Sequence, residues 1–220
     1  MAKVENIAEE PIMEFFNKNS FMKVKPDGFR IGRLLLSFGN MDENKKLVPG
    51  SNIDFWLDFR KAGAYNAHNL MHDILSGKLA AEIKKEKKDR LAANPNVKYA
   101  QPVRSYPGGV SAQKAKDRSI RTDGAAQAKI LKIQGGLKQP VLISVEEGPG
   151  RETEQGLIVP TYNGKPEQIV RVTVTWDDLK AMALAVQMHY GAFLSGQHVM
   201  KAIADEKAAR ERLKEGKNAA

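Results

Sequence analysis

Residues whose types and spacing suit catalysis are scarce in this chain. His68 and His72 are four residues apart, so on a helix they would face the same side and could share a metal ion. The string between them, His68-Asn-Leu-Met-His72, lacks the glutamate that serves as general base in metalloproteases, and no third ligand accompanies the pair. We therefore expect two histidines on a helix surface and no metal.

A second arrangement imitates the Mg²⁺ site of many nucleases. Glu82 and Lys84 follow Asp73 with the spacing of the acid, acid-x-Lys motif, whose carboxylate oxygens hold the metal. That motif needs its second acid and its lysine on a strand. Here both lie in a run rich in Ala, Glu and Lys, which favours a helix, so the match is interpreted as accidental. A nuclease is the minor alternative.

Other enzyme signatures are missing from the sequence. It contains no Gly-x-x-x-x-Gly-Lys-Ser/Thr phosphate loop and no nucleophile elbow around a serine. With no cysteine, the chain forms no disulfide, no thiolate metal site and no cysteine nucleophile, which fits a reducing compartment. These observations favour a binding protein with no catalytic residues and no cofactor.

Cations are the abundant functional groups. The net charge is +9, and basic surfaces gain affinity for polyanions by releasing counterions from phosphates. Residues 84–121 contain eleven Lys or Arg and three acids, and their Pro and Gly residues indicate a segment that is mobile until it binds. We expect this segment to hold phosphates while Tyr99 or Tyr106 stacks on an unpaired base. The residues that we expect to contact nucleic acid in this segment are Lys84, Lys85, Lys87, Lys88, Arg104, Tyr106, Lys114, Lys116, Arg118 and Arg121. The alternative is a solvated linker.

The elements that would position these groups form two copies of one pattern. After a shift of 119 residues, residues 52–77 align without gaps with residues 171–196, and seven of the 26 positions are identical. Both copies begin with the alternation of a half-buried strand and continue with the three-to-four-residue spacing of an amphipathic helix. Asp58 and Asp177 are suitable N-caps for these helices, and Gly77 and Gly196 are suitable C-caps. Asn163-Gly164 predicts a hairpin between strands at 156–160 and 168–176.

This pattern predicts an α+β fold of two pseudo-repeated units of antiparallel strands, each closed by a long amphipathic helix. The expected organisation is an N-terminal arm (1–27), one domain (28–200) and a charged C-terminal tail (201–220). The domain would comprise repeats 28–80 and 126–200, separated by a basic, partly flexible insertion at 84–125.

A further group of cations alternates with apolar residues in the expected strands, which predicts that they lie on an outer sheet face. These residues are Arg30, Arg33, Lys129, Lys132 and Arg171. Trp56 also alternates with apolar neighbours, so it is expected on an outer face. Asp54 and Asp58 flank it, and a subunit contact explains it at least as well as base stacking.

The strand 168–176 passing into Asp177-Asp-Leu-Lys180, the strand 141–146 before it and the matching residues 52–61 resemble the Whirly proteins and their single-unit relatives, the transcriptional positive cofactor four proteins. The resemblance covers residues 28–80 and 126–200. It implies binding of single-stranded DNA or guide RNA on the sheet, and assembly through helices into homo-oligomers. The long basic insertion and the few sheet aromatics depart from that pattern.

Together these features predict a single-stranded DNA-binding protein with low sequence specificity, acting in DNA replication or recombination and encoded by a phage or mobile element. The alternatives are an adaptor module for protein contacts and an RNA-binding protein. No apolar run approaches the roughly 20 residues that span a bilayer, so we expect a cytoplasmic protein without membrane contact.

Overall fold

The computed structural model describes residues 10–61, 66–97, 99–137 and 139–218. Its first unit is a four-stranded antiparallel sheet in the order β1-β2-β3-β4, followed by two helices. The elements are β1 (Met13–Phe16), β2 (Ser20–Lys25), β3 (Arg33–Asn40), β4 (Ile53–Asp58), α1 (Ala67–Leu75) and α2 (Lys78–Ala93), with a short 3₁₀ turn at Phe29–Ile31.

The second unit is a five-stranded antiparallel sheet with a long helix after its last strand. Its elements are β5 (Pro102–Val110), α3 (Ala112–Asp117), β6 (Ala126–Gly135), β7 (Val141–Glu152), β8 (Ile158–Pro160), β9 (Gln168–Val174) and α4 (Trp176–Asn218). The predicted α+β class and the two units of strands followed by a helix are thereby confirmed. The first unit differs in detail, because a nine-residue helix, α1, follows its sheet.

Both units begin earlier than the sequence indicates. β1 and β2 lie in the expected N-terminal arm, and β5 lies in the expected basic insertion. β5 pairs with β6 along its length, so residues 84–125 are not one mobile segment but α2, an edge strand and α3. Pro107 is tolerated because β5 is an edge strand, and Gly108 is needed because a Cβ there would lie 2.9 Å from the Phe55 ring.

The last edge of the second sheet is built from two short strands. β8 pairs with one end of β7 and β9 with the other end, and both run antiparallel to it. The predicted turn exists, since Lys165 N donates to Tyr162 O (2.8 Å) and both Asn163 and Gly164 have positive φ. The predicted hairpin is wrong, however, because the turn belongs to a loop that interrupts one edge and does not pair β8 with β9.

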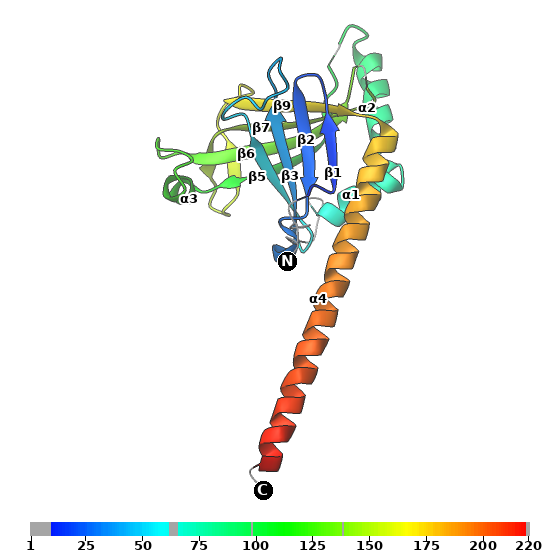
Figure 1. The fold of residues 1–220 in the computed structure, drawn as a ribbon. Coiled ribbons are helices and arrows are strands. Elements are labelled where there is room, and N and C mark those ends of the chain that lie inside the picture. Colours follow the sequence, from blue (N-terminus) through cyan, green and yellow to red (C-terminus); the bar gives the residue numbers. More distant parts are fainter. Residues whose placement is uncertain (1–9, 62–65, 98, 138, 219–220) are drawn as a thin grey trace.

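The two sheets pack face to face with crossing strands, and α1, α2 and α4 close the core at their margins (Figure 1). The shared core includes Phe38 and Leu57 of the first sheet, Leu131 and Ile143 of the second, and Leu179 of α4. Burial of these side chains is the main stabilising contribution to the fold.

Polar contacts join the β1-β2 turn to the free edge of β9. The Asn17 side chain accepts from Thr173 N (2.7 Å) and donates to Thr173 O (3.1 Å), while Ser20 Oγ donates to Arg171 O (2.6 Å). Edge strands expose unpaired backbone groups, and these bonds satisfy part of the β9 edge within the molecule.

The helix starts differ from the predicted caps. Thr175 Oγ1 accepts from Asp178 N (3.1 Å) and donates to the Asp178 carboxylate, so Thr175 and not Asp177 caps the start of α4. Asn66 caps α1 by accepting from His68 N, whereas Asp58 accepts from the backbone of Arg60 and Lys61 at the end of β4. Gly77 ends α1 in the left-handed conformation, but α4 continues through Gly196.

α4 is 43 residues long and projects away from the sheets (Figure 1). Its first half packs against the body through Leu179, Ala183, Val186 and Tyr190, and Tyr190 stacks on Phe59 with ring centroids 3.9 Å apart. Across the described residues, no helix combines the length and apolar character that crossing a bilayer requires.

Candidate nucleic-acid interface

The lysines of α2 occupy its solvent-facing side. Leu79 and Ile83 anchor the helix in the core. On a helix of 3.6 residues per turn, Lys84 and Lys88 point away from these two residues, while Lys87, one turn after Ile83, lies on the flank. All three side chains are exposed and make no ion pair with the described residues. They form the α2 lysine face, while Lys85 lies toward a groove on the helix flank.

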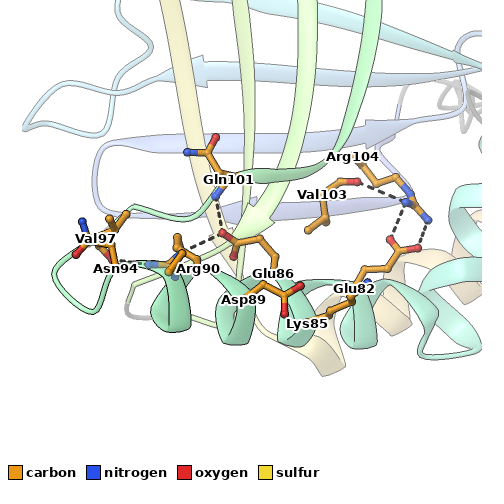
Figure 2. A pocket seen from close by; sticks show the side chains of 11 residues that line it. Glu82, Lys85, Glu86, Asp89, Arg90, Asn94, Val97, Gln101, Val103 and Arg104 are labelled. Atoms are coloured by element: carbon orange, nitrogen blue, oxygen red, sulfur yellow. Dashed lines mark hydrogen bonds and ion pairs between the residues drawn. The ribbon is translucent and has the colours of Figure 1, made fainter.

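The groove lies between α2 and the start of β5 and has a volume of about 660 Å³ (Figure 2). Arg104 donates to Glu82 (2.7 Å) and to Asp73 (2.9 Å), tying β5 to α2 and α1. Burial raises the pKa of Asp73, but hydrogen bonds from Arg104 and Lys78 outweigh it, so the net pKa is lowered. Two carboxylates already occupy the Arg104 guanidinium, so its charge is balanced within the molecule, and the phosphate contact through Arg104 stays a prediction.

Acids and bases also balance farther along the groove. Glu86 Oε1 accepts from Arg90 Nε (2.9 Å) and from Gln101 N (2.9 Å), and Arg90 donates in turn to Val97 O. Figure 2 shows these contacts fixing the chain that leads from α2 into β5. The groove is thus a structural junction with no excess of cations.

Tyr106 is buried, with 2% of its surface exposed, so its predicted role in stacking on a base is wrong. Its ring belongs to the core shared by the two sheets, and burial raises the pKa of its hydroxyl to about 12. Tyr99, by contrast, is 73% exposed beside β5 and stays available for stacking.

A second group of free cations lies around α3. Lys114, Lys116 and Arg118 are exposed and have no ion pair among the described residues. Arg121 is different, because its guanidinium is held by Asp123 and by Glu167 (2.7 Å). The hydrogen bond from Arg121 lowers the pKa of Asp123 to about 2, and the same bond raises the pKa of Arg121. Arg121 therefore fastens the loop before β9 and offers no free charge to a ligand.

The outer face of the second sheet carries Lys132 and Arg171 on either side of Ser144. The three residues are Cα partners in one row across β6, β7 and β9, and this row alternates with core-facing rows. The predicted outer-face placement of Lys132 and Arg171 is what the structure shows. Lys132 Nζ donates to Glu146 (2.6 Å), whereas Arg171 is exposed and without an ion pair in the described part of the chain.

Ser105 and Tyr162 are further residues of this face that the sequence analysis does not single out. Ser105 is the Cα partner of Lys132 on β5, and it extends the row to the edge of the sheet. The Tyr162 hydroxyl lies 3.5 Å from Glu146, and its pKa is raised by burial and by that carboxylate. Strand alternation could have located Ser144 and Ser105, but Tyr162 comes from a loop.

Three of the predicted sheet cations are placed elsewhere. Lys129 points toward the first sheet, where its Nζ contacts Asp54 O and Glu147 (both 3.0 Å). Arg30 lies in the 3₁₀ turn and is exposed. Arg33 begins β3 and pairs with Asp58 at 3.4 Å. The expectation that these three share one sheet face with Lys132 and Arg171 is wrong.

Trp56 lies on the outer face of the first sheet, as its alternation predicts, and is 41% exposed. Its ring covers Gly28, where an added Cβ would come within 2.5 Å of it. The same face carries Phe16 and Phe21 with Lys23 Nζ about 6 Å from both rings, and Lys23 pairs with Glu14. This face holds aromatic groups, and two of its cations, Lys23 and Arg33, are paired with acids.

The free cations of α2 and α3 thus form two separate clusters and not one clamp. α2 and α3 lie at opposite ends of the second sheet, so the two clusters are separated by the length of β5, roughly 30 Å for nine residues (Figure 1). Between them runs the outer face with the Ser105-Lys132-Ser144-Arg171 row. Arg171 is a free cation on this face, at a distance from both clusters.

No metal centre is recognisable within the described ranges, where no three His, Cys, Asp or Glu side chains come together. His68 packs against the rings of Phe59 and Tyr190, with centroids 4.9 Å and 5.5 Å away, so packing accounts for this histidine.

No family model matches this chain, and no curated protein matches it. The chain is similar to a solved structure of the plant transcriptional regulator PBF-2, with a TM-score of 0.44 and 10% sequence identity. The match covers 85% of this chain and 91% of that one.

Proposed function

We propose that this protein binds single-stranded nucleic acid along the outer face of its second sheet. The observation that carries the proposal is the placement of two unpaired basic clusters, the α2 lysine face and the α3 cations, at the two ends of that sheet. Arg171 supplies a free cation between them. Ser105 and Ser144, in the same row, have small side chains that leave room for a ligand on the sheet surface.

The chemistry of this face suits a flexible polyanion. Exposed lysines hold phosphates without reading sequence, which gives low specificity and strong dependence on salt. A single strand can follow a sheet surface and present bases to exposed aromatics, such as Tyr99 near the α2 end. A rigid duplex cannot adapt to both ends of the sheet in the same way.

The biological setting that we propose is DNA replication or recombination, with binding as the activity and no catalysis. The ligand is DNA in the first instance, and RNA is the alternative. A homo-oligomer in the cytoplasm of a bacterial or phage-infected cell fits this role. The second candidate function, an adaptor for proteins, is favoured by the exposed apolar side chains of α4.

Fluorescence anisotropy with labelled single-stranded and double-stranded oligonucleotides of equal length, over a salt series, tests the proposal. We expect tighter binding to the single strand. The triple variant Lys84→Glu, Lys87→Glu, Lys88→Glu should weaken it at least tenfold at low salt. If each lysine holds one phosphate, the slope of log K against log salt should become shallower by about 2, at about 0.7 per contact.

The matched control replaces three exposed lysines elsewhere, Lys46→Glu, Lys61→Glu and Lys201→Glu, and so makes the same change in net charge. It should retain most of the affinity. Equal loss in both triple variants, or no binding to either oligonucleotide by the unaltered protein, contradicts the proposal. An adaptor would keep its protein partner in both variants.

A further inference from the structure

α4 has two apolar sides, of which the body covers one. The covered side includes Leu179, Ala183, Val186 and Tyr190. The second side faces the opposite direction and leaves four large apolar side chains exposed: Leu184 (52%), Met188 (65%), Val199 (57%) and Ile203 (55%). An exposed apolar stripe of this length on one element is typical of an interaction surface.

The helix beyond the body also lacks tertiary support. From Leu194 to Lys207 every side chain is exposed, and nothing among the described residues packs over this stretch. Isolated helices shorter than about 12–15 residues are marginal in water, and most helical stability in proteins comes from packing of an apolar face. The distal half of α4 therefore has the properties of a helix that is completed by a partner.

The order of residues along the exposed stripe identifies the partner. Ten positions fall within an arc of about 140° on the side opposite to the covered one. They are Leu184, Ala185, Met188, Gly191, Ala192, Ser195, Gly196, Val199, Ala202 and Ile203.

This series reads nearly the same in both directions about a midpoint between Phe193 and Leu194. Reversal pairs Leu184 with Ile203, Met188 with Val199, and Gly191 with Gly196. A two-fold contact requires this property, because residue i of one copy meets residue j of the other while j meets i.

The centre of the series contains only small residues. An added Cβ at Gly191 or at Gly196 meets nothing within 4 Å, so the single chain gives no reason for either glycine. Glycine inside a helix costs about 1 kcal/mol relative to alanine. Small residues at a helix crossing let two backbones approach closely, which provides the missing reason.

We propose that the outward stripe of α4 binds the same stripe of a second copy of this chain, with the two helices antiparallel and the two-fold axis between Phe193 and Leu194. Met188 then lies against Val199 of the second copy, and Leu184 against Ile203. The stripe and its flanks offer fewer residues than the 20 to 30 per side of a standard interface. We expect association in roughly the micromolar range.

The test is sedimentation velocity of the full chain over a concentration series. The unaltered chain should pass from monomer to dimer. Met188→Glu alone and Val199→Lys alone should each weaken the dimer at least tenfold, because each places a charge in an apolar contact. The double variant should regain most of the association, since an antiparallel pair sets the new carboxylate opposite the new ammonium in both contacts. In a parallel pair like charges would meet.

Cysteine cross-linking provides a second measurement, because the chain has no cysteine of its own. Mixed Met188→Cys and Val199→Cys proteins should form a disulfide-linked dimer. Val199→Cys alone should not, because the two copies of residue 199 would lie roughly 16 Å apart along the antiparallel helices. Circular dichroism should show that the variants remain folded. A chain that stays monomeric, a double variant that does not recover, or cross-linking of Val199→Cys alone overturns the proposal.

Discussion

Replacing Asn17 with alanine should loosen the junction between the two units. The Asn17 side chain makes three hydrogen bonds with Thr173, to its N–H (2.7 Å), its carbonyl oxygen (3.1 Å) and its hydroxyl (3.2 Å). These two residues are 156 positions apart, so the bonds join the first hairpin to the last strand. The substitution removes all three bonds and leaves the N–H and the carbonyl oxygen of Thr173 without a protein partner.

The expected loss follows from the number of bonds. A net contribution of about 1 kcal/mol for each hydrogen bond gives a decrease of about 3 kcal/mol in the free energy of unfolding. In a domain of this size, 1 kcal/mol shifts Tm by about 2–4 °C, so Tm should fall by roughly 10 °C. Thermal and urea unfolding, followed by circular dichroism, measure both quantities.

Asn19→Ala in the same turn is the control. The Asn19 side chain is exposed, and only its backbone oxygen is used, to accept from Met41 N (2.8 Å). This variant should unfold within about 0.5 kcal/mol of the unaltered chain. If Asn17→Ala is as stable as Asn19→Ala, the described junction does not hold the two units together in solution.

Three further predictions concern burial, backbone geometry and the ligand path. Because burial raises the pKa of Tyr106 from 10.0 to about 12, the native state keeps a proton that the unfolded chain loses, so the stability from this group falls as pH rises from 10 to 12. As pH rises over that range, the free energy of unfolding of Tyr106→Phe should therefore fall less than that of the unaltered chain, as measured by pH-jump urea titrations. Parallel plots of unfolding free energy against pH for the two proteins contradict this. Gly109→Ala should cost several kcal/mol, since its Cβ would lie 2.1 Å from Gln127 O, whereas Gly164→Ala, where φ is also positive but space is open, should cost about 1 kcal/mol. Urea unfolding compares the two, and equal losses argue against the tight approach at Gly109. Trp56→Phe should change the affinity for single-stranded nucleic acid by less than twofold in anisotropy titrations, because Trp56 lies on the first sheet. A large loss of affinity would mean that the nucleic acid binds to the first sheet.

Local patterns were sufficient for some elements of this fold. The alternation of Ile53, Phe55 and Leu57 predicts both β4 and the outward direction of Trp56, because strand geometry alone fixes them. The helical spacing that includes Leu179 and Ala183 predicts the core-facing side of α4. The change from strand to helix in each half reveals the two units even though their aligned Asp residues have different roles.

Long-range contacts account for what the sequence could not predict. β5 contains Pro107, Gly108 and Gly109, which argue against a strand until β6 supplies its partners and Phe55 explains the missing side chain. The ion pair of Arg104 with Asp73 spans 31 positions, and that of Arg121 with Glu167 spans 46. No local pattern indicates that these cations are already neutralised, so counting charges overestimates the cations that a ligand can use.

The path of the ligand is tested most directly by photo-cross-linking. A single-stranded oligonucleotide with photoreactive bases is bound to the full chain, irradiated and digested, and the attached peptides are identified by mass spectrometry. We predict cross-links on the outer face of the second sheet, at peptides containing Lys132, Ser144 or Arg171, and at the α2 end near Tyr99. Cross-links confined to the first sheet around Phe16 and Trp56, or none at saturating oligonucleotide, contradict the proposal.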